Sequence, residues 1–226
     1  MMIELQFWPI LVQWPMLLKG AAFTIGLTGA AAVFGMLIGV LCAWSRGNGP
    51  LFWRWLFRAY VELIRNTPFI VQLFFVFFGL PAAGVKLSPL TASILAMVIN
   101  LGAYSAEIIR AGIEATPRGQ YEAAKSLALG PLQTFVYVVL PPALKKVWPA
   151  LVSQIIIVML GSAVCGQIAA QELSYYTNLI SSRNFRAFEA FLVAAAVYVA
   201  LGVALRQFLG WAGPRWLFGR AAGAGR

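Results

Sequence analysis

Three charged residues at helical spacing mark a polar segment, residues 116–142, in a chain that is otherwise apolar. Glu122 lies four residues after Arg118 and three before Lys125, so a helix would bring its carboxylate within reach of both cations. No nucleophile, acid/base pair or metal-binding cluster accompanies them. The chemistry that this pattern favours is charge-assisted hydrogen bonding at a contact surface, and not catalysis.

The residues around this charged row predict a short helix. Thr116-Pro117 indicates its start, because a hydroxyl can cap free N–H groups and proline is favoured at the first helical position. Gly130-Pro131 indicates its end. A short helix of small residues, held outside the bilayer between two apolar segments, is suited to docking into a groove of another protein. The alternative is an ordinary solvated helix within a loop.

The rest of the chain offers little for other kinds of chemistry. The sequence has no histidine, which removes the usual axial ligand of membrane haems and the commonest ligand of zinc and copper. Cys42 and Cys165 both lie in apolar runs, which favours reduced, packing thiols over a disulfide. The G-x-x-x-x-G-K-[ST] pattern does not occur, so any ATP that drives this protein is expected to bind to a partner.

Composition identifies a membrane protein that crosses the bilayer several times. The 226 residues are 61% hydrophobic and 11% charged, with a mean hydropathy of +0.82, which is outside the range of ordinary soluble domains. In a membrane protein a net charge of +10 is expected to reflect orientation in the bilayer, and we therefore reject nucleic-acid binding.

Five apolar segments are long enough to span a bilayer. Residues 1–18 before them read as an interfacial segment with tryptophans at headgroup level, and residues 170–186 read as a loop. The predicted spans are about 20–45, 60–80, 90–109, 147–168 and 187–205. The first span holds four glycines that would permit close helix contact or be simply tolerated: Gly26, Gly29, Gly35 and Gly39.

The distribution of basic residues predicts the orientation. With five spans and residues 116–146 as a cytoplasmic loop, thirteen Lys and Arg residues fall on the cytoplasmic side and four on the other. This positive-inside bias places the N-terminus outside. Residues 131–146 are expected to form a second polar-edged helix in that loop, before the fourth span begins at Trp148-Pro149.

Several polar residues lie within the predicted spans and are candidates for a transport path. Thr67-Pro68 would interrupt the second span and free backbone carbonyls to face water, or form a kink that neighbouring helices compensate. Asn100 is expected to face other helices, as interhelical contact or as part of a path. The fourth span carries a polar stripe expected to face the bundle interior: Ser153, Gln154, Ser162 and Gln167.

The segment around Glu122 resembles the EAA loop of the permease subunits of bacterial ATP-binding cassette importers. That pattern is E-A-A, three residues, G, nine residues, I-x-L-P; the match comprises Glu122-Ala123-Ala124, Val138 and Leu140-Pro141. One position differs, because Ala128 stands where the pattern has glycine. Stretches at 65–75, 103–113 and 181–189 are similar to the polar amino acid branch of that family.

The resemblance implies an all-α integral membrane protein with the type I importer fold: five transmembrane helices and a cytoplasmic coupling helix. It implies coupling to the ATPase through residues of the short helix and its end: Gly119, Tyr121, Glu122, Ala123, Ala124, Lys125 and Leu127. It implies a substrate path lined by residues of the second, third and fourth spans: Thr67, Pro68, Asn100, Gln154, Gly161 and Ser162.

The resemblance also implies the partners and the location. We expect a multi-pass protein of the bacterial inner membrane that works with two ATPase subunits, a second permease and an external amino acid-binding protein. The partner ATPase binds ATP and Mg, and this chain holds no cofactor. Cationic-substrate relatives commonly carry acidic residues in the fourth span, where this chain has Gln154 and Leu160-Gly161. An acidic or neutral polar amino acid is therefore favoured, as is a heterodimer over a homodimer.

Two other functions fit the composition. A secondary carrier or channel driven by an ion gradient would require ionisable groups deep within its spans. In this chain four glutamates lie near the ends of predicted spans instead: Glu62, Glu107, Glu172 and Glu189. A structural or assembly subunit of the membrane would leave the polar segment at residues 116–142 without a role. An ATP-driven permease remains the favoured function.

Overall fold

The computed structural model describes residues 5–217 and contains helices but no strand among them. Two of the arginines counted for orientation, Arg220 and Arg226, lie outside the described residues. Four long helical segments, or five counting a bent pair, are apolar and long enough to cross a membrane. The α-helices longer than six residues are α2 (Trp14–Asn48), α3 (Leu51–Arg65), α6 (Pro89–Glu114), α7 (Arg118–Ser126), α9 (Leu140–Gly161), α10 (Leu173–Asn184) and α11 (Ala187–Ala212).

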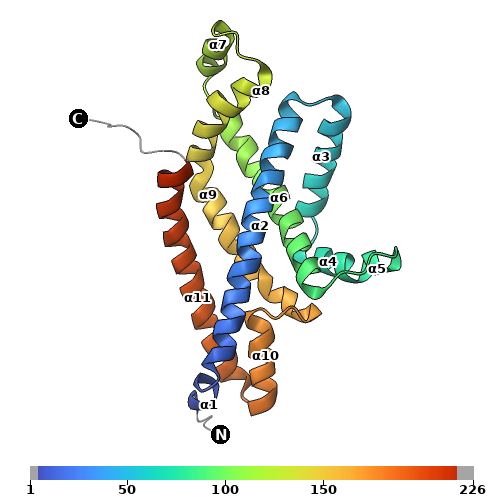
Figure 1. Cartoon of the computed structure of the whole chain (residues 1–226), viewed down its shortest axis with the longest axis vertical. Helices are drawn as coiled ribbons and strands as arrows, with labels where there is room; N and C mark the ends of the chain where they lie inside the picture. The colour runs from blue at the N-terminus through green and yellow to red at the C-terminus, as the bar shows by residue number, and fades with distance from the viewer. Residues whose placement is uncertain (1–4, 218–226) are drawn as a thin grey trace, which may run out of the picture.

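The long helices alternate in direction, as five passes require (Figure 1). The short α1 (Trp8–Leu11) and the start of α2 lie at one end of the molecule, and α7 lies at the other. The end of α11 returns toward the end that carries α7. The chain therefore begins on the side opposite to α7, as the positive-inside bias predicts for an external N-terminus.

The second predicted span, 60–80, is not one continuous helix. The helix α3 ends at Arg65, and the segment from α4 (Phe69–Phe74) to α5 (Leu80–Ala82) leaves it at an angle of 112°. A π-helical turn, η1 (Phe75–Gly79), joins α4 to α5. Pro68 lacks an N–H and disfavours helix at Thr67, so the chain turns at the interruption expected from the sequence.

The fourth span is longer than predicted. The expectation of a separate helix over 131–146 is wrong, because residues 131–168 form one continuous apolar helical segment. It comprises α8 (Pro131–Gln133), the π-helical η2 (Thr134–Val139), α9 and the 3₁₀-helical η3 (Ser162–Ile168). The widened π turn directly precedes Pro141 and Pro142, which cannot donate to a regular helical ladder. Pro149 lies inside α9 and does not begin a helix.

The helices α2 and α6 pack against each other through two of the four glycines. A Cβ added to Gly35 would lie 2.9 Å from Leu101, and one added to Gly39 would lie 2.7 Å from Ser105. Gly26 and Gly29 have nothing within 4 Å of such a Cβ. Close helix contact is therefore the role of Gly35 and Gly39 only.

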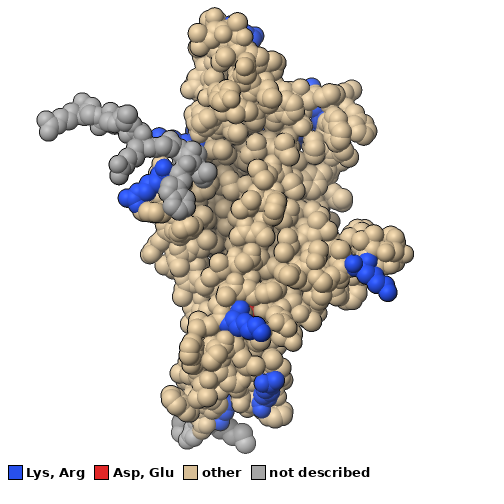
Figure 2. All heavy atoms as spheres, viewed as in Figure 1, with Lys and Arg blue, Asp and Glu red and all other residues tan. Residues whose placement is uncertain are grey.

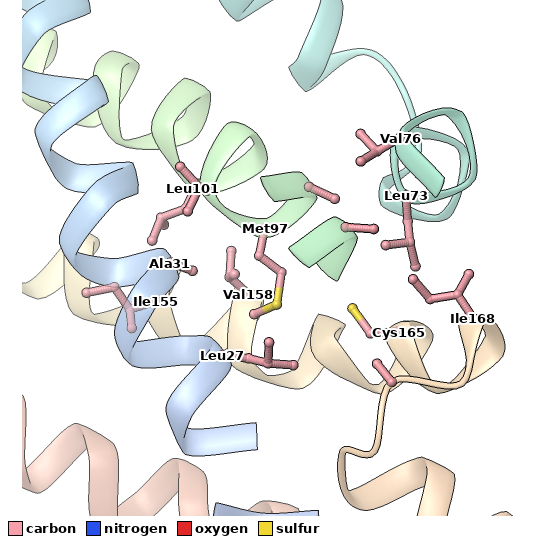
Figure 3. Close-up of a cluster of buried hydrophobic side chains, with 14 residues drawn as sticks. Leu27, Ala31, Leu73, Val76, Met97, Leu101, Ile155, Val158, Cys165 and Ile168 are labelled. Carbon is pink, nitrogen blue, oxygen red and sulfur yellow. The ribbon is translucent and has the colours of Figure 1, made fainter. Parts of the chain in front are cut away.

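A core of buried apolar side chains joins the long helices to the broken span (Figure 3). Both cysteines are buried and unpaired, as expected. Cys165 belongs to this core, and Figure 3 shows its side chain beside Met97 of α6. The labelled members come from α2, α4, η1, α6, α9 and η3: Leu27, Ala31, Leu73, Val76, Met97, Leu101, Ile155, Val158, Cys165 and Ile168.

The end of the molecule opposite α7 is more ordered than the sequence indicated. The expected loop 170–186 contains the twelve-residue helix α10. Glu172 is fully buried and caps this helix, accepting a hydrogen bond from the Tyr175 N–H (2.8 Å) and another from the Tyr198 hydroxyl of α11 (2.6 Å).

In the view of Figure 2, basic side chains lie toward the two ends and on the projecting α4–α5 arm, and the middle of the long helices shows none.

Candidate functional site

A cavity of about 310 Å³ lies where the broken span meets α6 and α9. It contains five of the six residues predicted for the substrate path and joins three parts of the chain that are far apart in sequence. Its lining residues are Thr67, Pro68, Phe69, Asn100, Tyr104, Gln154, Ile157, Val158 and Gly161. None of them is charged, and its polar groups are two side-chain amides, a hydroxyl, a phenol and the backbone.

The side chain of Gln72, which is 8% exposed, forms hydrogen bonds across the interruption at Thr67-Pro68. Its Nε2 lies 2.7 Å from the carbonyl oxygen of Ile64, 3.0 Å from that of Thr67 and 2.9 Å from the Thr67 hydroxyl. Freed carbonyls that find no donor are costly in a membrane. Gln72 satisfies two of them, so the break is a built feature and the Thr67 hydroxyl is fixed beside the cavity.

Asn100 makes the interhelical contact that was one of the two roles left open for it. It is buried, and its Nδ2 donates to Oε1 of Gln72 at 2.9 Å, which ties α6 to the broken span. It also lines the cavity. The same side chain therefore contributes to the interhelical contact and to the surface of the cavity.

Gln154 and Gly161 line the opposite wall on α9. Gln154 is half-buried, and among the described residues its amide makes no hydrogen bond, so both its donor and its acceptor remain available. Ser162 does not line the cavity: it is fully buried, and its hydroxyl donates to the Met159 carbonyl at 2.6 Å. The assignment of Ser162 to the path is not supported, because the chain enters η3 at this residue and turns its hydroxyl back onto α9.

Sequence reasoning missed Gln72 and Tyr104. Tyr104 lines the cavity, and the guanidinium of Arg65 lies 5.6 Å from the centre of its ring. Tyr104 falls four residues after Asn100, one helical turn along the same face, and this spacing was the available signal. Gln72 offered a polar side chain five residues after the expected break.

The helix α7 presents most of the predicted coupling residues outward. Gly119, Glu122, Ala123, Lys125 and Leu127 are exposed, and Leu127 is 73% exposed. Glu122 makes no ion pair with Arg118 or Lys125 among the described residues, so the expected pairs within the helix are absent. Its carboxylate is free to meet another protein.

Two predicted coupling residues face the body of the protein instead. Ala124 is 1% exposed, and Tyr121 is half-buried. Tyr121 and Lys125 line a cavity of about 270 Å³ between α7 and the ends of α2, α6 and η2. Partial burial raises the pKa of the Tyr121 phenol. Ala124 and Tyr121 seat the helix, and its other face is the available one.

The two ends of α7 differ from the sequence prediction. Pro117 is the N-cap residue, and the Thr116 hydroxyl bonds back to the Gly112 carbonyl (3.4 Å) without capping α7. At the other end Ala128 takes a left-handed conformation (φ 54°), and the N–H groups of Ala128 and Leu129 bond to the carbonyls of Lys125 and Ala124. This is a Schellman turn. It ends the helix before Gly130, which begins the next one.

Ala128 therefore keeps the geometry that glycine would supply at this position of the EAA pattern. The departure from the pattern changes the residue and not the turn.

A family model described as "Binding-protein-dependent transport system inner membrane component" matches residues 35–217. The chain belongs to this family. As an inner membrane component it is a permease, and the family model, the helices and the charge bias agree on a bacterial inner membrane location.

Individual relatives of this permease transport amino acids. It is 35% identical to the L-cystine transport system permease protein of Bacillus subtilis (strain 168) over 194 residues, 84% of this chain and 83% of the relative. It is 33% identical to the glutamine transport system permease protein of Escherichia coli (strain K12) over 204 residues, 89% of this chain and 92% of the relative.

Solved structures share the fold of this permease. A crystal structure of an amino acid ABC transporter with histidines matches with a TM-score of 0.84 and 32% identity, covering 94% of this chain and all of that one (100%). An inward-facing MetNI methionine ABC transporter matches with a TM-score of 0.69 and 23% identity, over 91% of this chain and 95% of that one, and shows the fold alone. The permease thus has the type I importer fold predicted from its sequence.

Proposed function

We propose that this permease forms half of the path of an ATP-driven importer for a neutral or acidic polar amino acid. The observation that carries the proposal is the uncharged cavity of about 310 Å³ between the broken span, α6 and α9. Its volume lies at the lower end of the range for small-molecule sites, roughly 300–1,000 Å³. Its amide, hydroxyl and phenol groups suit the polar atoms of an amino acid.

The charge around the cavity supports the substrate class. No carboxylate lines it to compensate a cationic side chain, which would be poorly solvated there. One cation lies beside the cavity: the guanidinium of Arg65 is 5.6 Å from the centre of the Tyr104 ring. A positive charge beside the path favours acidic and neutral substrates over arginine or lysine.

We propose that α7 docks to one ATPase subunit through its exposed face, with Glu122 making charge-assisted hydrogen bonds there. ATP-driven closure of the two ATPases would move the docked helices and open the path outward, and hydrolysis would reset it. ATP shifts this equilibrium only by its differential affinity for the two states. ATP and Mg bind to the partner, and a separate external protein delivers the amino acid.

We also propose a second, nonidentical permease across the path. The cavity of this chain provides hydrogen-bonding side chains but no charged partner for the carboxylate and ammonium groups of an amino acid. A different second chain would supply them.

The experiment is ATP-dependent uptake into proteoliposomes that contain the whole transporter and its binding protein. L-glutamine, L-cystine, L-glutamate and L-arginine compete in turn with a labelled neutral substrate. The expected result is strong competition by a neutral or acidic amino acid and little by L-arginine. Gln154→Leu should lower uptake while Ile157→Leu, in the same cavity, leaves it near wild type. Preferred uptake of L-arginine would overturn the substrate class.

A further inference from the structure

A second, larger cavity of about 500 Å³ lies between α2, α3 and α6, at the end of the molecule that carries α7 (Figure 1). The orientation places this end on the cytoplasmic side of the membrane. Four arginines and one glutamate line it together with apolar and aromatic residues: Ala43, Arg46, Gly47, Leu51, Arg54, Trp55, Arg58, Arg110, Ile113 and Glu114. The transport path does not include any of them.

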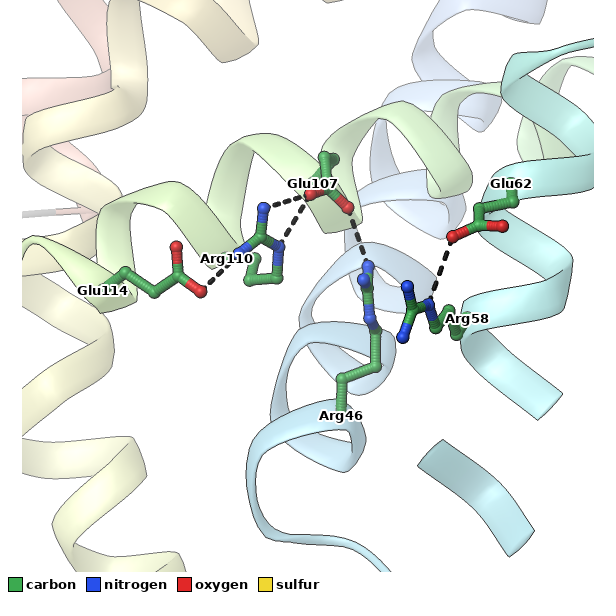
Figure 4. Close-up of polar contacts among 6 residues, drawn as sticks. All are labelled: Arg46, Arg58, Glu62, Glu107, Arg110 and Glu114. Atoms are coloured by element: carbon green, nitrogen blue, oxygen red, sulfur yellow. Dashed lines mark hydrogen bonds and ion pairs between the residues drawn. The ribbon is translucent and has the colours of Figure 1, made fainter. Parts of the chain in front are cut away.

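Two of these arginines are held by ion pairs that fix the inner wall (Figure 4). The Nη1 of Arg46 lies 2.7 Å from the Glu107 carboxylate, and Arg110 bonds both Glu107 and Glu114. Glu107 thereby joins α2 to α6. These pairs leave Arg46 and Arg110 part-buried and rigid, with further N–H groups that the carboxylates do not use.

The other two arginines, both on α3, are more open. The Nε of Arg54 donates to the Arg46 carbonyl at 3.1 Å, and among the described residues Arg54 has no acidic partner. Arg58 uses only its Nε on Glu62 (3.1 Å) and lies 5.9 Å from the centre of the Trp55 ring. Figure 4 shows the guanidinium groups of Arg46 and Arg58 reaching into the same gap between α2 and α3. Four guanidinium groups thus line one cavity against three carboxylates that are already paired with them, and Arg54 keeps its charge without an acidic partner among the described residues.

The surroundings of the cavity indicate where its ligand comes from. The helix α3 exposes large apolar and aromatic side chains next to its arginines: Leu51 is 69% exposed, Phe52 69% and Trp55 63%. Tryptophan and arginine at the end of a span are typical of the headgroup layer. Leu51 and Trp55 also line the cavity, so its wall combines apolar and aromatic side chains with cationic ones.

We propose that this cavity binds the phosphate headgroup of an anionic phospholipid from the cytoplasmic leaflet. Arginine suits phosphate because its planar fork can donate two parallel hydrogen bonds to it. Basic pockets between transmembrane helices on the cytoplasmic side are places where anionic headgroups bind. The bound headgroup would tie α3, which leads to the break at Thr67-Pro68, to the ion-paired unit of α2 and α6.

The test is native mass spectrometry of the purified transporter complex titrated with phosphatidylglycerol, with phosphatidylethanolamine as the zwitterionic comparison. Arg54→Gln and Arg58→Gln, singly and together, remove the open donors without breaking the Arg46–Glu107 pair. Lys146→Gln is the control, because it removes an exposed cation on α9, outside the cavity.

Wild type and Lys146→Gln should retain phosphatidylglycerol saturably and should not retain phosphatidylethanolamine in the same way. Each arginine substitution should weaken the apparent affinity about fivefold, since a basic residue near the headgroups contributes about that much. Equal retention of both lipids, or unchanged binding in the double variant, would overturn the site. Displacement of phosphatidylglycerol by an equal concentration of inorganic phosphate would overturn the lipid as its source.

Discussion

Asn100 of α6 donates its side-chain N–H to the amide oxygen of Gln72 in α4, at 2.9 Å. Gln72 in turn donates to the carbonyls of Ile64 and Thr67 at the break of the second span. One pair of amides therefore holds the interrupted backbone, positions the Thr67 hydroxyl and fixes one wall of the cavity. The pair thus shapes one wall of the cavity, and Gln154 adds a hydrogen-bonding group without a partner among the described residues.

Substitutions of the two glutamines should separate these roles. Gln72→Leu leaves the Thr67 carbonyl and the Asn100 amide without the partner that Gln72 provides, so it should lower the free energy of unfolding by roughly 1–3 kcal/mol and also reduce uptake. Gln154→Leu should reduce uptake alone, because its amide bonds to nothing in the described chain. Thermal unfolding of the purified complex, measured beside uptake, distinguishes them. Equal stability of both variants would contradict the structural role of Gln72.

The neighbouring alanines of α7 offer a second matched pair. Ala123 is exposed and Ala124 is 1% exposed against the permease itself. Ala123→Leu should weaken binding of the ATPase subunit without loss of thermal stability, because the added atoms point toward the partner. Ala124→Leu should lower stability by about 1–3 kcal/mol through overpacking beneath the helix.

Co-purification of the ATPase subunit and the unfolding temperature of the permease measure the two effects. If Ala123→Leu retains the ATPase as wild type does, the exposed face of α7 is not the docking face.

The turn after α7 should be improved by glycine. Ala128 has φ 54°, a left-handed conformation that costs a residue with a Cβ about 1–2 kcal/mol. Glycine avoids that cost, but it loses more conformational freedom on folding, which offsets roughly 0.5–1 kcal/mol of the gain. Ala128→Gly should therefore stabilise the Schellman turn by up to about 1 kcal/mol, and Ala128→Val should destabilise it.

Hydrogen exchange of the N–H groups of Ala128 and Leu129 reports this turn directly. Faster exchange in Ala128→Gly than in wild type would contradict the assignment.

Several features of this fold could be predicted from local sequence. The long apolar segments and the helix around Glu122 follow from composition and spacing, whereas the grouping of Thr67, Asn100 and Gln154 was implied by the resemblance to the permease family. Each of these sequence signals involves residues within a few helical turns of one another.

Other features required tertiary information. The interruption at Thr67-Pro68 was expected, but local sequence predicted neither its angle of 112° nor the hydrogen bond between Gln72 and Asn100 beside it. The fourth span continues through Pro141-Pro142 by way of a π turn that no local sequence pattern predicted. In the sequence Ser162 follows the helical spacing of the polar stripe on the fourth span. In the structure η3 begins at Ser162, and its hydroxyl bonds back to α9 and does not line the cavity.

Stability should depend on pH through Glu172. Burial raises the pKa of this carboxyl, against the lowering effect of hydrogen bonds from Tyr198 and the backbone of α10. The folded protein therefore holds this proton more tightly than the unfolded chain, whose glutamates have a pKa of about 4.3. The resulting stabilisation is complete below that value and is lost as pH rises through the folded-state pKa.

Glu172→Gln should remove this component, so that the unfolding temperature of the variant falls less than that of wild type between acidic and neutral pH. Parallel curves for the two proteins would show that the Glu172 carboxyl titrates alike in both states.

The central claim is that this chain is a permease that couples amino acid movement to a partner ATPase. The most direct measurement is affinity purification of the chain expressed with its genomic neighbours, followed by an ATPase assay with candidate amino acids and the binding protein. The account predicts recovery of a nucleotide-binding subunit whose ATP hydrolysis rises with one neutral or acidic amino acid. Recovery of the chain alone, with uptake that follows an ion gradient, would contradict it.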